Sequence, residues 1–203
     1  MGGPTDPHLA GPAVSPATAG EGSPPLEIER VFLLRGLPPL PDRAEAHRLE
    51  QGYLDDPLDD STSSDAGAGE SGFREGRVRR WTGPDGVVRC FHTVKRGRGI
   101  VREEIERIID EGEFDRAWAR TGRRRIAKTR YRIPEGDLVW EVDRFDDLPL
   151  VMAEVELPAV DHPVEVPAWM EGWIVREISE DPRYRNSALA RGIAGGTPLP
   201  PLV

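Results

Sequence analysis

Two glutamates, Glu27 and Glu29, lie two residues apart in the segment Leu26 to Leu33, with Ile28 between them. If this segment is a strand, successive side chains point to opposite faces, so both carboxylates share one face. Adjacent carboxylates repel one another and are costly to desolvate unless a cation or a hydrogen-bond donor satisfies them. The pair therefore indicates either a solvent-exposed sheet face or a site that binds a cation.

The same alternation recurs along the chain with both signs of charge. The charged positions that share a face within their segments are Glu27/Glu29, Arg77/Arg79, Lys95, Arg102/Glu104/Glu106, Lys128/Arg130, Glu141/Asp143 and Glu154/Glu156. One interpretation is an antiparallel sheet with exposed, salt-bridged strands. The favoured interpretation is a mainly β (α+β) fold in which about eight antiparallel strands close into a barrel with a polar interior and a few flanking helices.

A polar tunnel of this kind suits a polyphosphate bound together with divalent cations. Carboxylate oxygens are hard ligands for Mg²⁺ or Mn²⁺, and Arg and Lys side chains bind phosphate oxygens. A metal ion can stabilise charge developing on phosphoryl oxygens and can lower the pKa of its bound water to make a nucleophile. Lys95 and Lys128 are the only lysines among 27 basic residues, either by chance or because a compact ammonium suits a phosphate oxygen.

Composition narrows the class of protein. The chain has 203 residues, which is enough for one ordinary domain, and a net charge of −9, which disfavours general attraction to nucleic acid or anionic lipid. It has no apolar run long enough to span a membrane and no signal-peptide pattern. The single cysteine, Cys90, excludes an intramolecular disulfide and a thiolate zinc cluster. We expect a cytoplasmic protein, monomeric or homodimeric, whose partner is a small molecule.

Residues 26–192 are expected to form the domain, with 57–72 as a flexible loop within it. Residues 1–25, rich in Gly, Pro, Ala, Ser and Thr, are predicted to be a disordered leader, and 193–203 a tail. Alternation predicts strands at 27–34, 51–54, 75–81, 87–95, 102–108, 125–132, 139–145 and 151–157. Helices are expected at 42–50, 112–121 and 187–193, and turns at Pro84–Gly86 and at Gly97 and Gly99.

The histidines and tryptophans give weaker indications. His92 has the opposite parity to Lys95 on its expected strand, so it should face the outer packing. His8, His47 and His162 fall in expected loops or on a helix surface and are predicted to face solvent. The tryptophans at 140, 169 and 173 are expected to be packing residues.

The motifs also occur in a recognisable order between Leu26 and Ala190. They are E-I-E-R at Glu27, Q-G-Y-L at Gln51, E-x-R-x-R at Glu75, H-T-V-K ending at Lys95, R-E-E-I-E from Arg102, K-T-R-Y from Lys128, E-V-D at Glu141, E-V-E at Glu154 and E-D-P-R-Y-R-N from Glu180. As an ordered set they resemble the CYTH, or triphosphate tunnel metalloenzyme, family, and its short bacterial members most closely. That family includes class IV adenylate cyclases, thiamine triphosphatases and bacterial inorganic triphosphatases.

The resemblance implies an eight-stranded antiparallel tunnel barrel that hydrolyses a triphosphate, inorganic or organic, by attack of metal-bound water. It implies Mg²⁺ or Mn²⁺ ligands among Glu27, Glu29, Glu104, Glu106, Asp143, Glu154 and Glu156. It implies phosphate binding by Arg77, Arg79, Lys95, Arg102, Lys128 and Arg130. The residues most directly tied to catalysis would be Glu29, Lys95, Arg77 and Arg79.

One position departs from the family pattern. The signature E-x-E-x-K has its lysine at position 31, where this chain has Val31, and the neighbouring Arg30 should point out of the tunnel. A charge-assisted contact is worth roughly 1.5–3 kcal/mol, so the absence of this lysine is expected to lower the activity. The alternatives to a hydrolase are therefore a class IV-type adenylate cyclase and a non-catalytic binder of triphosphate or polyphosphate.

Overall fold

The computed structural model describes residues 26–55, 74–96 and 101–198, and only the backbone of residues 26–27, 74–75, 95–96 and 101–104. The predicted leader (1–25), the loop 57–72, the turn at Gly97 and Gly99, and His8 lie outside the described residues. So do the last five residues of the predicted tail.

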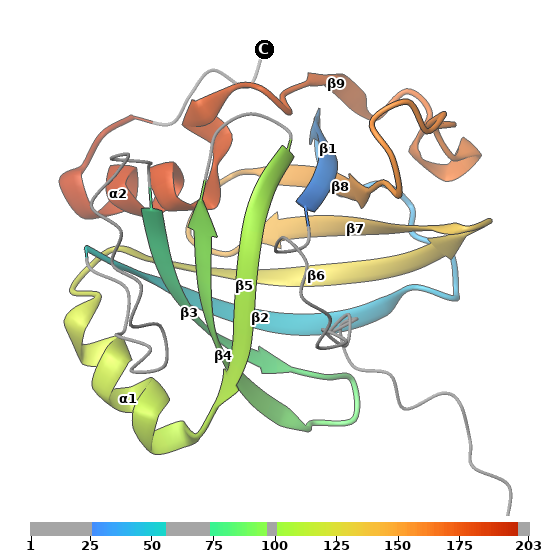
Figure 1. Cartoon of the computed structure of the whole chain (residues 1–203). Coiled ribbons are helices and arrows are strands. Elements are labelled where there is room, and N and C mark those ends of the chain that lie inside the picture. The colour runs from blue at the N-terminus through green and yellow to red at the C-terminus, as the bar shows by residue number, and fades with distance from the viewer. Residues whose placement is uncertain (1–25, 56–73, 97–100, 199–203) are drawn as a thin grey trace, which may run out of the picture.

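An antiparallel sheet of nine strands, with two α-helices beside it, makes up most of the described chain (Figure 1). The strands are β1 (Leu26–Leu34), β2 (Glu45–Leu54), β3 (Arg74–Thr82), β4 (Val88–Arg96), β5 (Val101–Ile109), β6 (Arg125–Glu135), β7 (Leu138–Phe145), β8 (Val151–Glu156) and β9 (Ile174–Glu177). Their order in the sheet is β5-β4-β3-β2-β6-β7-β8-β1-β9, and β5 also pairs with β1. The prediction of a mainly β antiparallel fold is therefore confirmed.

Strand β1 is shared between three neighbours. It pairs with β8 from Glu29 to Leu34, with β5 from Leu26 to Ile28 and with β9 from Phe32 to Leu34. The backbone pairing between β1 and β5 thus comprises, in the part of the chain that is described, three residue pairs. These pairs alone do not establish the closed barrel predicted from the alternation.

Two predictions about the elements are wrong. Residues 42–50 do not form a helix, because Glu45 onward belongs to β2, which pairs with β3 on one edge and β6 on the other. This pairing supplies the backbone hydrogen bonds that a helix would have provided, so the local capping pattern is overridden. The predicted eight strands also omitted β9, whose four residues are too short for a clear alternation.

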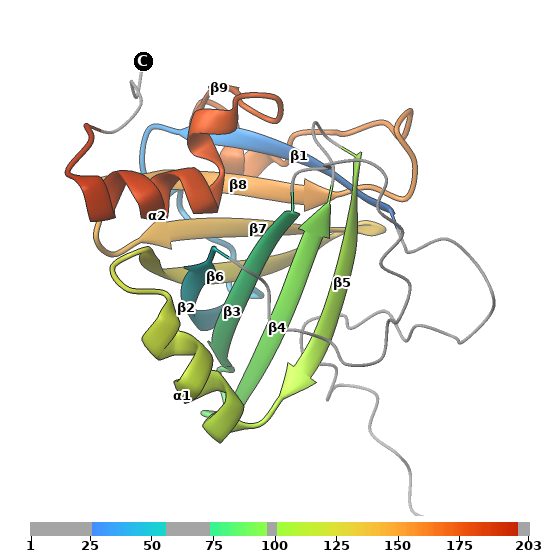
Figure 2. The ribbon, with the colours of Figure 1, turned by 60° about the vertical axis from the view of Figure 1, so that its left-hand side comes forward.

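The helices cover different parts of the sheet. Helix α1 (Glu111–Arg120) begins at Asp110, whose side chain accepts a 2.6 Å hydrogen bond from the Glu113 amide. It buries Phe114 and Ala117 against the outer face of the sheet. Helix α2 (Asn186–Gly195) lies at one end of the strands (Figure 2) and ends at Gly196, where φ is 68°. Both predicted helices at these places are confirmed.

Two apolar clusters complete the core on opposite sides of the sheet. Leu189 and Ala190 of α2 pack with inner-face residues of the strands, which are Leu33, Tyr53, Ile126, Phe145 and Met152. Trp140 and Val155, on the outer face, are buried with Met170 of a short 3₁₀ helix (Ala168–Met170), and Trp169 and Trp173 pack against them. The three tryptophans are packing residues, as predicted. Of the described helices, none is long and apolar enough to cross a membrane.

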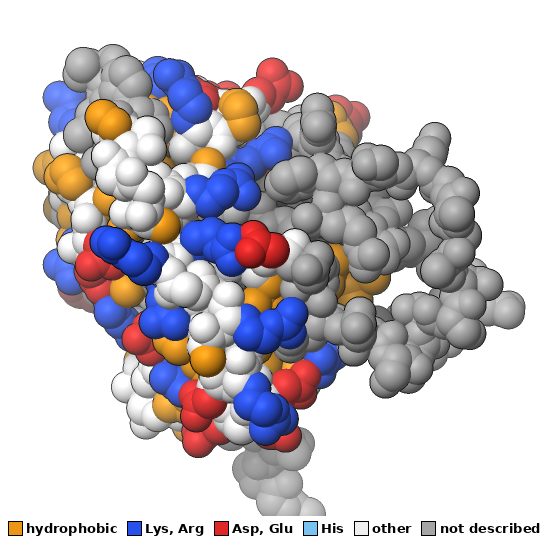
Figure 3. All heavy atoms as spheres, turned by 90° about the vertical axis from the view of Figure 1, so that its left-hand side faces the viewer, with side chains coloured by type: hydrophobic (Ala, Val, Ile, Leu, Met, Phe, Trp, Pro, Cys, Tyr) orange, Lys and Arg blue, Asp and Glu red, His pale blue; other side chains and the backbone are white. Residues whose placement is uncertain are grey.

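The exterior carries its own ion pairs, such as Arg124 with Asp55 and Arg48 with Asp146. On the face formed by α1 and α2, basic side chains are interspersed with acidic and apolar ones (Figure 3). Pairs this exposed contribute little stability, typically about 0–1 kcal/mol each. This face therefore carries an ordinary mixture of basic, acidic and apolar side chains.

Gly52 of β2 makes a close approach that explains the glycine of the Q-G-Y-L motif. A Cβ at this position would lie 2.6 Å from Cγ2 of Thr121, which is buried at the end of α1 and donates a 2.8 Å hydrogen bond to the Trp118 carbonyl. We expect Gly52→Ala to destabilise the protein by about 1–3 kcal/mol through this clash, measured by urea unfolding. Thr121→Ser, which removes Cγ2, should recover part of that loss, and a double variant no more stable than Gly52→Ala would contradict this explanation.

Candidate active site

The strand register places the predicted site residues on one face of the sheet. Directly opposed residues of an antiparallel pair point to the same face. The opposed sets are Glu27–Arg102, Glu29–Glu156, Glu75–Lys95–Glu104, Arg77–Thr93–Glu106, Arg130–Asp143 and Glu141–Glu154. Glu27, Lys95, Arg102 and Glu104 are placed on this face by their backbone positions alone. The predicted parity is thus confirmed on every strand that carries a predicted site residue.

A first ionic cluster joins β3, β4 and β5. Glu106 accepts hydrogen bonds from Nη2 of Arg79 at 2.9 and 3.0 Å and from Nη2 of Arg77 at 3.3 Å. Thr93, which is fully buried, donates to the same carboxylate at 2.6 Å and accepts from Arg77 at 3.1 Å. One carboxylate therefore holds two guanidinium groups side by side.

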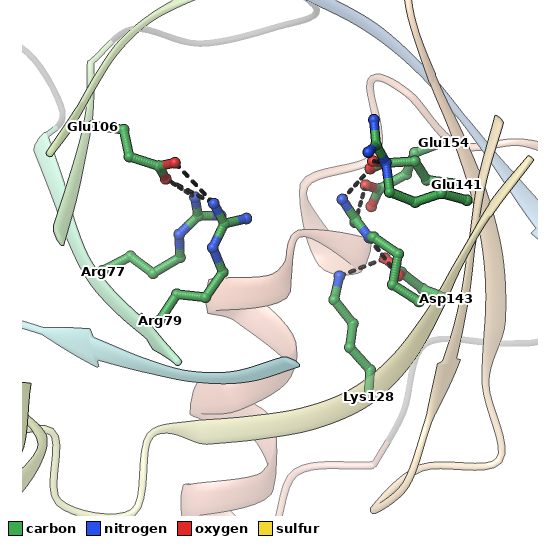
Figure 4. A network of polar contacts seen from close by, with 9 residues as sticks. Arg77, Arg79, Glu106, Lys128, Glu141, Asp143 and Glu154 are labelled. Atoms are coloured by element: carbon green, nitrogen blue, oxygen red, sulfur yellow. Dashed lines mark hydrogen bonds and ion pairs between the residues drawn. The ribbon is translucent and has the colours of Figure 1, made fainter. Parts of the chain in front are cut away.

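A second ionic cluster joins β6, β7 and β8. Lys128 and Asp143, with 1% and 0% of their side chains exposed, form an ion pair. Arg130 donates to both oxygens of Asp143 at 2.7 Å, to Glu154 at 2.5 Å, and also to Glu141. Figure 4 shows this cluster and the Arg77–Arg79–Glu106 cluster on opposite sides of the inner face, with their charged groups turned toward one another.

The charges in the second cluster alter one another's ionisation. Burial lowers the pKa of Lys128, and the adjacent charge of Arg130 lowers it further, while Asp143 opposes both effects. Burial works against ionisation of Asp143, yet Arg130 and Lys128 hold its pKa below the usual value. Burial raises the pKa of Glu154, and the negative charges of Asp143 and Glu29 contribute. Between Asp143 and Glu154, it is therefore Glu154 whose negative charge is less well compensated by the neighbouring cations.

Glu29 and Glu156 are directly opposed on β1 and β8, and Glu154 is opposed to Val31. Among the described residues, no three His, Cys, Asp or Glu side chains gather closely enough to hold a metal ion. The donor chemistry of Glu29, Glu154 and Glu156 nevertheless fits a hard divalent cation. Burial, with a smaller contribution from the charges of Asp143 and Glu29, raises the pKa of Glu154, and a bound cation would favour its ionised form. Asp143 and Glu106, also predicted as ligands, accept hydrogen bonds from cationic side chains, as Glu154 does from Arg130.

Val31 and Arg30 lie as the alternation predicts. Val31 packs against the apolar cluster beneath α2, on the same face as Glu29. Arg30 points the other way and pairs with Glu177 of β9 at 2.6 and 3.0 Å. It lines an outer pocket of about 280 Å³ together with Ile28 and Leu157. No cation therefore replaces the missing lysine from the neighbouring position.

Several inner-face residues were missed or misassigned. His47 was predicted to face solvent but is 4% exposed, stacked on Trp81 with ring centroids 5.3 Å apart. Gln51 is also buried on this face, and Thr93 supports Glu106. The parity of His47 relative to Arg130 could have identified it once residues 45–50 were known to belong to β2, whereas Gln51 and Thr93 already lay on predicted strands. The predicted outward orientation of His92, which is opposite Val78 and buried, is confirmed.

His47 should make stability depend on pH. Burial lowers its pKa, and Arg132 and Arg130 lower it further, while Glu45 and Glu141 oppose them. Because the folded-state pKa lies below the unfolded value near 6.5, the unfolded chain binds the proton first as the pH falls. We expect the free energy of unfolding to decrease below about pH 6.5, by at most about 1.4 kcal/mol per pH unit for one proton.

The measurement for His47 is urea unfolding from pH 8 to pH 5 in the wild type and His47→Gln. The variant should show a shallower decrease. His162, whose side chain is 22% exposed, provides the control, since His162→Gln should leave the slope unchanged. Equal slopes in the wild type and His47→Gln would contradict the assignment.

Comparison with known proteins finds relatives in sequence and in structure. The chain is 35% identical over 172 residues to the inorganic triphosphatase of Nitrosomonas europaea, covering 82% of this chain and 98% of that protein. It is 38% identical over 96 residues to an inorganic triphosphatase of Acetivibrio thermocellus, covering 46% of this chain and 59% of that protein. The solved structure of the inorganic triphosphatase NE1496 superposes with a TM-score of 0.51 at 33% identity, covering 81% and 93% of the two chains. No family model matches the chain.

Proposed function

Because this chain belongs to the CYTH, or triphosphate tunnel metalloenzyme, family, we propose that it is a hydrolase that cleaves the terminal phosphate from a triphosphate. The observation that carries the proposal is the pair of ionic clusters, each with two cations, that face one another across the inner face (Figure 4). Arg77 and Arg79 stand on one wall, and Lys128 and Arg130 on the other. A chain of phosphates bound between them would meet a cation on each side.

Inorganic triphosphate is the proposed substrate, in keeping with the names of the relatives. The protein's own residues would bind and orient it. The Arg77–Arg79 pair and Arg130 would bind its oxygens, while Asp143 keeps Lys128 in place. Such preorganised cations stabilise charge that develops as the phosphoryl group transfers, without reorganising at that moment.

The proposed cofactor is Mg²⁺ or Mn²⁺, held by Glu29, Glu154 and Glu156 with Glu27 beside them in sequence. When bound, such an ion neutralises phosphate charge and activates a water molecule for attack. We also propose that the β1–β5 pairing closes eight strands around this site as a tunnel. The protein would act in the cytoplasm as a monomer or homodimer.

Phosphate release from inorganic triphosphate, assayed with Mg²⁺ and with Mn²⁺, tests the proposal. We expect release that stops on addition of a chelator. ATP should be assayed in parallel, because cyclic AMP and pyrophosphate as products would identify a cyclase. Metal-dependent binding of triphosphate without any product would identify a binder, the alternative that Val31 favours. Either outcome would overturn the assignment as a triphosphatase.

Val31 gives a direct test of the missing cation. It is opposed to Glu154 and has the same parity as Glu29, so a lysine there could reach the phosphates. We expect Val31→Lys to increase kcat/KM for inorganic triphosphate about tenfold, which corresponds to roughly 1.4 kcal/mol of a charge-assisted contact. Val31→Met provides the uncharged control. If Val31→Lys and Val31→Met change kcat/KM equally, the length of the side chain and not its charge determines the effect.

A further inference from the structure

We infer that Glu106 is a positioning residue that holds Arg77 and Arg79 in the geometry that receives phosphate, and is not a metal ligand. The inference rests on the proposed function and adds a role for one side chain within it. Glu106 is the carboxylate on the β5 side of the site (Figure 4), away from the carboxylates of the second cluster. Glu29, Glu154 and Glu156, which offer the oxygens for a metal, belong to β1 and β8.

The contacts of Glu106 support this role. Its Oε1 accepts from Arg79, and its Oε2 accepts from Arg79, Arg77 and Thr93 at 2.6–3.3 Å. A carboxylate whose two oxygens already accept this many donors, two of them cationic, is poorly suited to bind a metal ion as well. The contacts with Glu106 use only Nη2 of each guanidinium group. A guanidinium group carries five N–H donors and a permanent positive charge, which attracts phosphate.

Electrostatics explains why the two arginines need this carboxylate. Arg77 and Arg79 share a strand face two residues apart, and both side chains are only 11% exposed. Like charges so close together and so little hydrated repel one another. Glu106 lies within 3.3 Å of both, which offsets the repulsion and fixes the Nη2 atoms beside each other. Phe91 supports Arg79 further, with its ring centroid 4.9 Å from the guanidinium carbon.

Thr93 adds a hydroxyl group to the contacts between Glu106 and the two arginines. It is completely buried, donates to Glu106 and accepts from Arg77. It therefore locks the carboxylate and one guanidinium into a single orientation. Thr93 cannot itself contribute charge to substrate or metal, so an effect of its hydroxyl on turnover would report positioning.

The experiment compares Glu106→Gln with the wild type in steady-state hydrolysis of inorganic triphosphate, over a titration of Mn²⁺. Positioning predicts a 10- to 100-fold lower kcat, with the Mn²⁺ concentration for half-maximal activity changed less than twofold. Thr93→Val, which removes the hydroxyl, should lower kcat about tenfold. Thr93→Ser, which keeps the hydroxyl, should retain the wild-type kcat. Glu113→Gln is the matched control, because Glu113 pairs with Arg107 at 2.5 Å on the outer side of β5 and should not affect kcat.

Stability supplies a readout that does not need activity. If Glu106 binds Arg79, a double-mutant cycle between Glu106→Gln and Arg79→Gln should show coupling of about tenfold in the unfolding constant. A large rise in the Mn²⁺ requirement of Glu106→Gln would make Glu106 a metal ligand and overturn the inference, as would unchanged kcat or zero coupling. If the wild type itself releases no phosphate from any triphosphate, the proposed function fails, and the inference fails with it.

Discussion

Glu29→Gln is expected to lower kcat/KM for inorganic triphosphate by about 10²–10⁴-fold, the largest effect on activity predicted for this protein. The amide keeps the volume of the side chain but removes its negative charge. Glu29 is opposed to Glu156 and its charge contributes to the raised pKa of Glu154. A divalent cation held by this group would therefore lose an anionic ligand. The measurement is phosphate release at fixed triphosphate over a titration of Mn²⁺.

The control for Glu29→Gln is Glu50→Gln, which removes one carboxylate from the outer face of β2. Glu50 lies 4.0 Å from Arg80, and its side chain is 39% exposed. Its loss should leave both the rate and the Mn²⁺ requirement unchanged. Should Glu29→Gln keep the wild-type rate, the metal would have to bind elsewhere, and the assignment of the β1–β8 carboxylates would fall. A partial rescue at high Mn²⁺ would support it.

The inner face of the sheet could be predicted from sequence because strand periodicity is a strict local rule. Side chains two residues apart share a face wherever a strand forms. The charged pairs Arg77/Arg79, Lys128/Arg130 and Glu154/Glu156 thus had to point together, and the register confirms it. Periodicity does not predict which strands face one another across the site. That expectation came from the resemblance of the ordered motifs to the family.

The segment before Gln51 shows where local reasoning fails. Asp42 and Glu45 form a plausible capping pattern, but β3 and β6 both pair with residues from Glu45 or Arg48 onward. Long-range hydrogen bonds of this kind leave no local trace in sequence. The misassigned helix also hid His47, because a helix surface and a strand interior predict opposite exposures for it.

The sequence likewise could not predict which cationic side chain each carboxylate binds. Parity places Glu106 and Glu154 on the same face but does not say which cations they bind. In the structure, Glu106 and Asp143 are engaged by arginine or lysine, and Glu154 is engaged by Arg130 alone among its described hydrogen-bonding partners. Carboxylates with the same spacing in sequence therefore differ in the number and kind of cationic side chains that they bind.

Asp143→Asn should have the largest effect on stability, about 3–5 kcal/mol of the free energy of unfolding. Asp143 is fully buried and compensates both Lys128 and Arg130. An asparagine of the same shape would leave these two cations close together in a poorly hydrated place, with one anion fewer. That loss is a large part of the roughly 5–15 kcal/mol that stabilises a typical domain. Urea unfolding at pH 7 measures it.

Two comparisons make the Asp143 prediction specific. Asp115→Asn removes an aspartate that also pairs with an arginine, Arg80 at 3.1 Å, but is 68% exposed, so it should cost less than about 0.5 kcal/mol. Lys128→Met in combination with Asp143→Asn should cost less than the sum of the single substitutions, because the second change removes a cation left uncompensated by the first. Additive losses, or an Asp143→Asn variant as stable as Asp115→Asn, would mean that Lys128 does not depend on Asp143. The cationic wall formed by β6 would then be held in place by packing rather than by its buried ion pair.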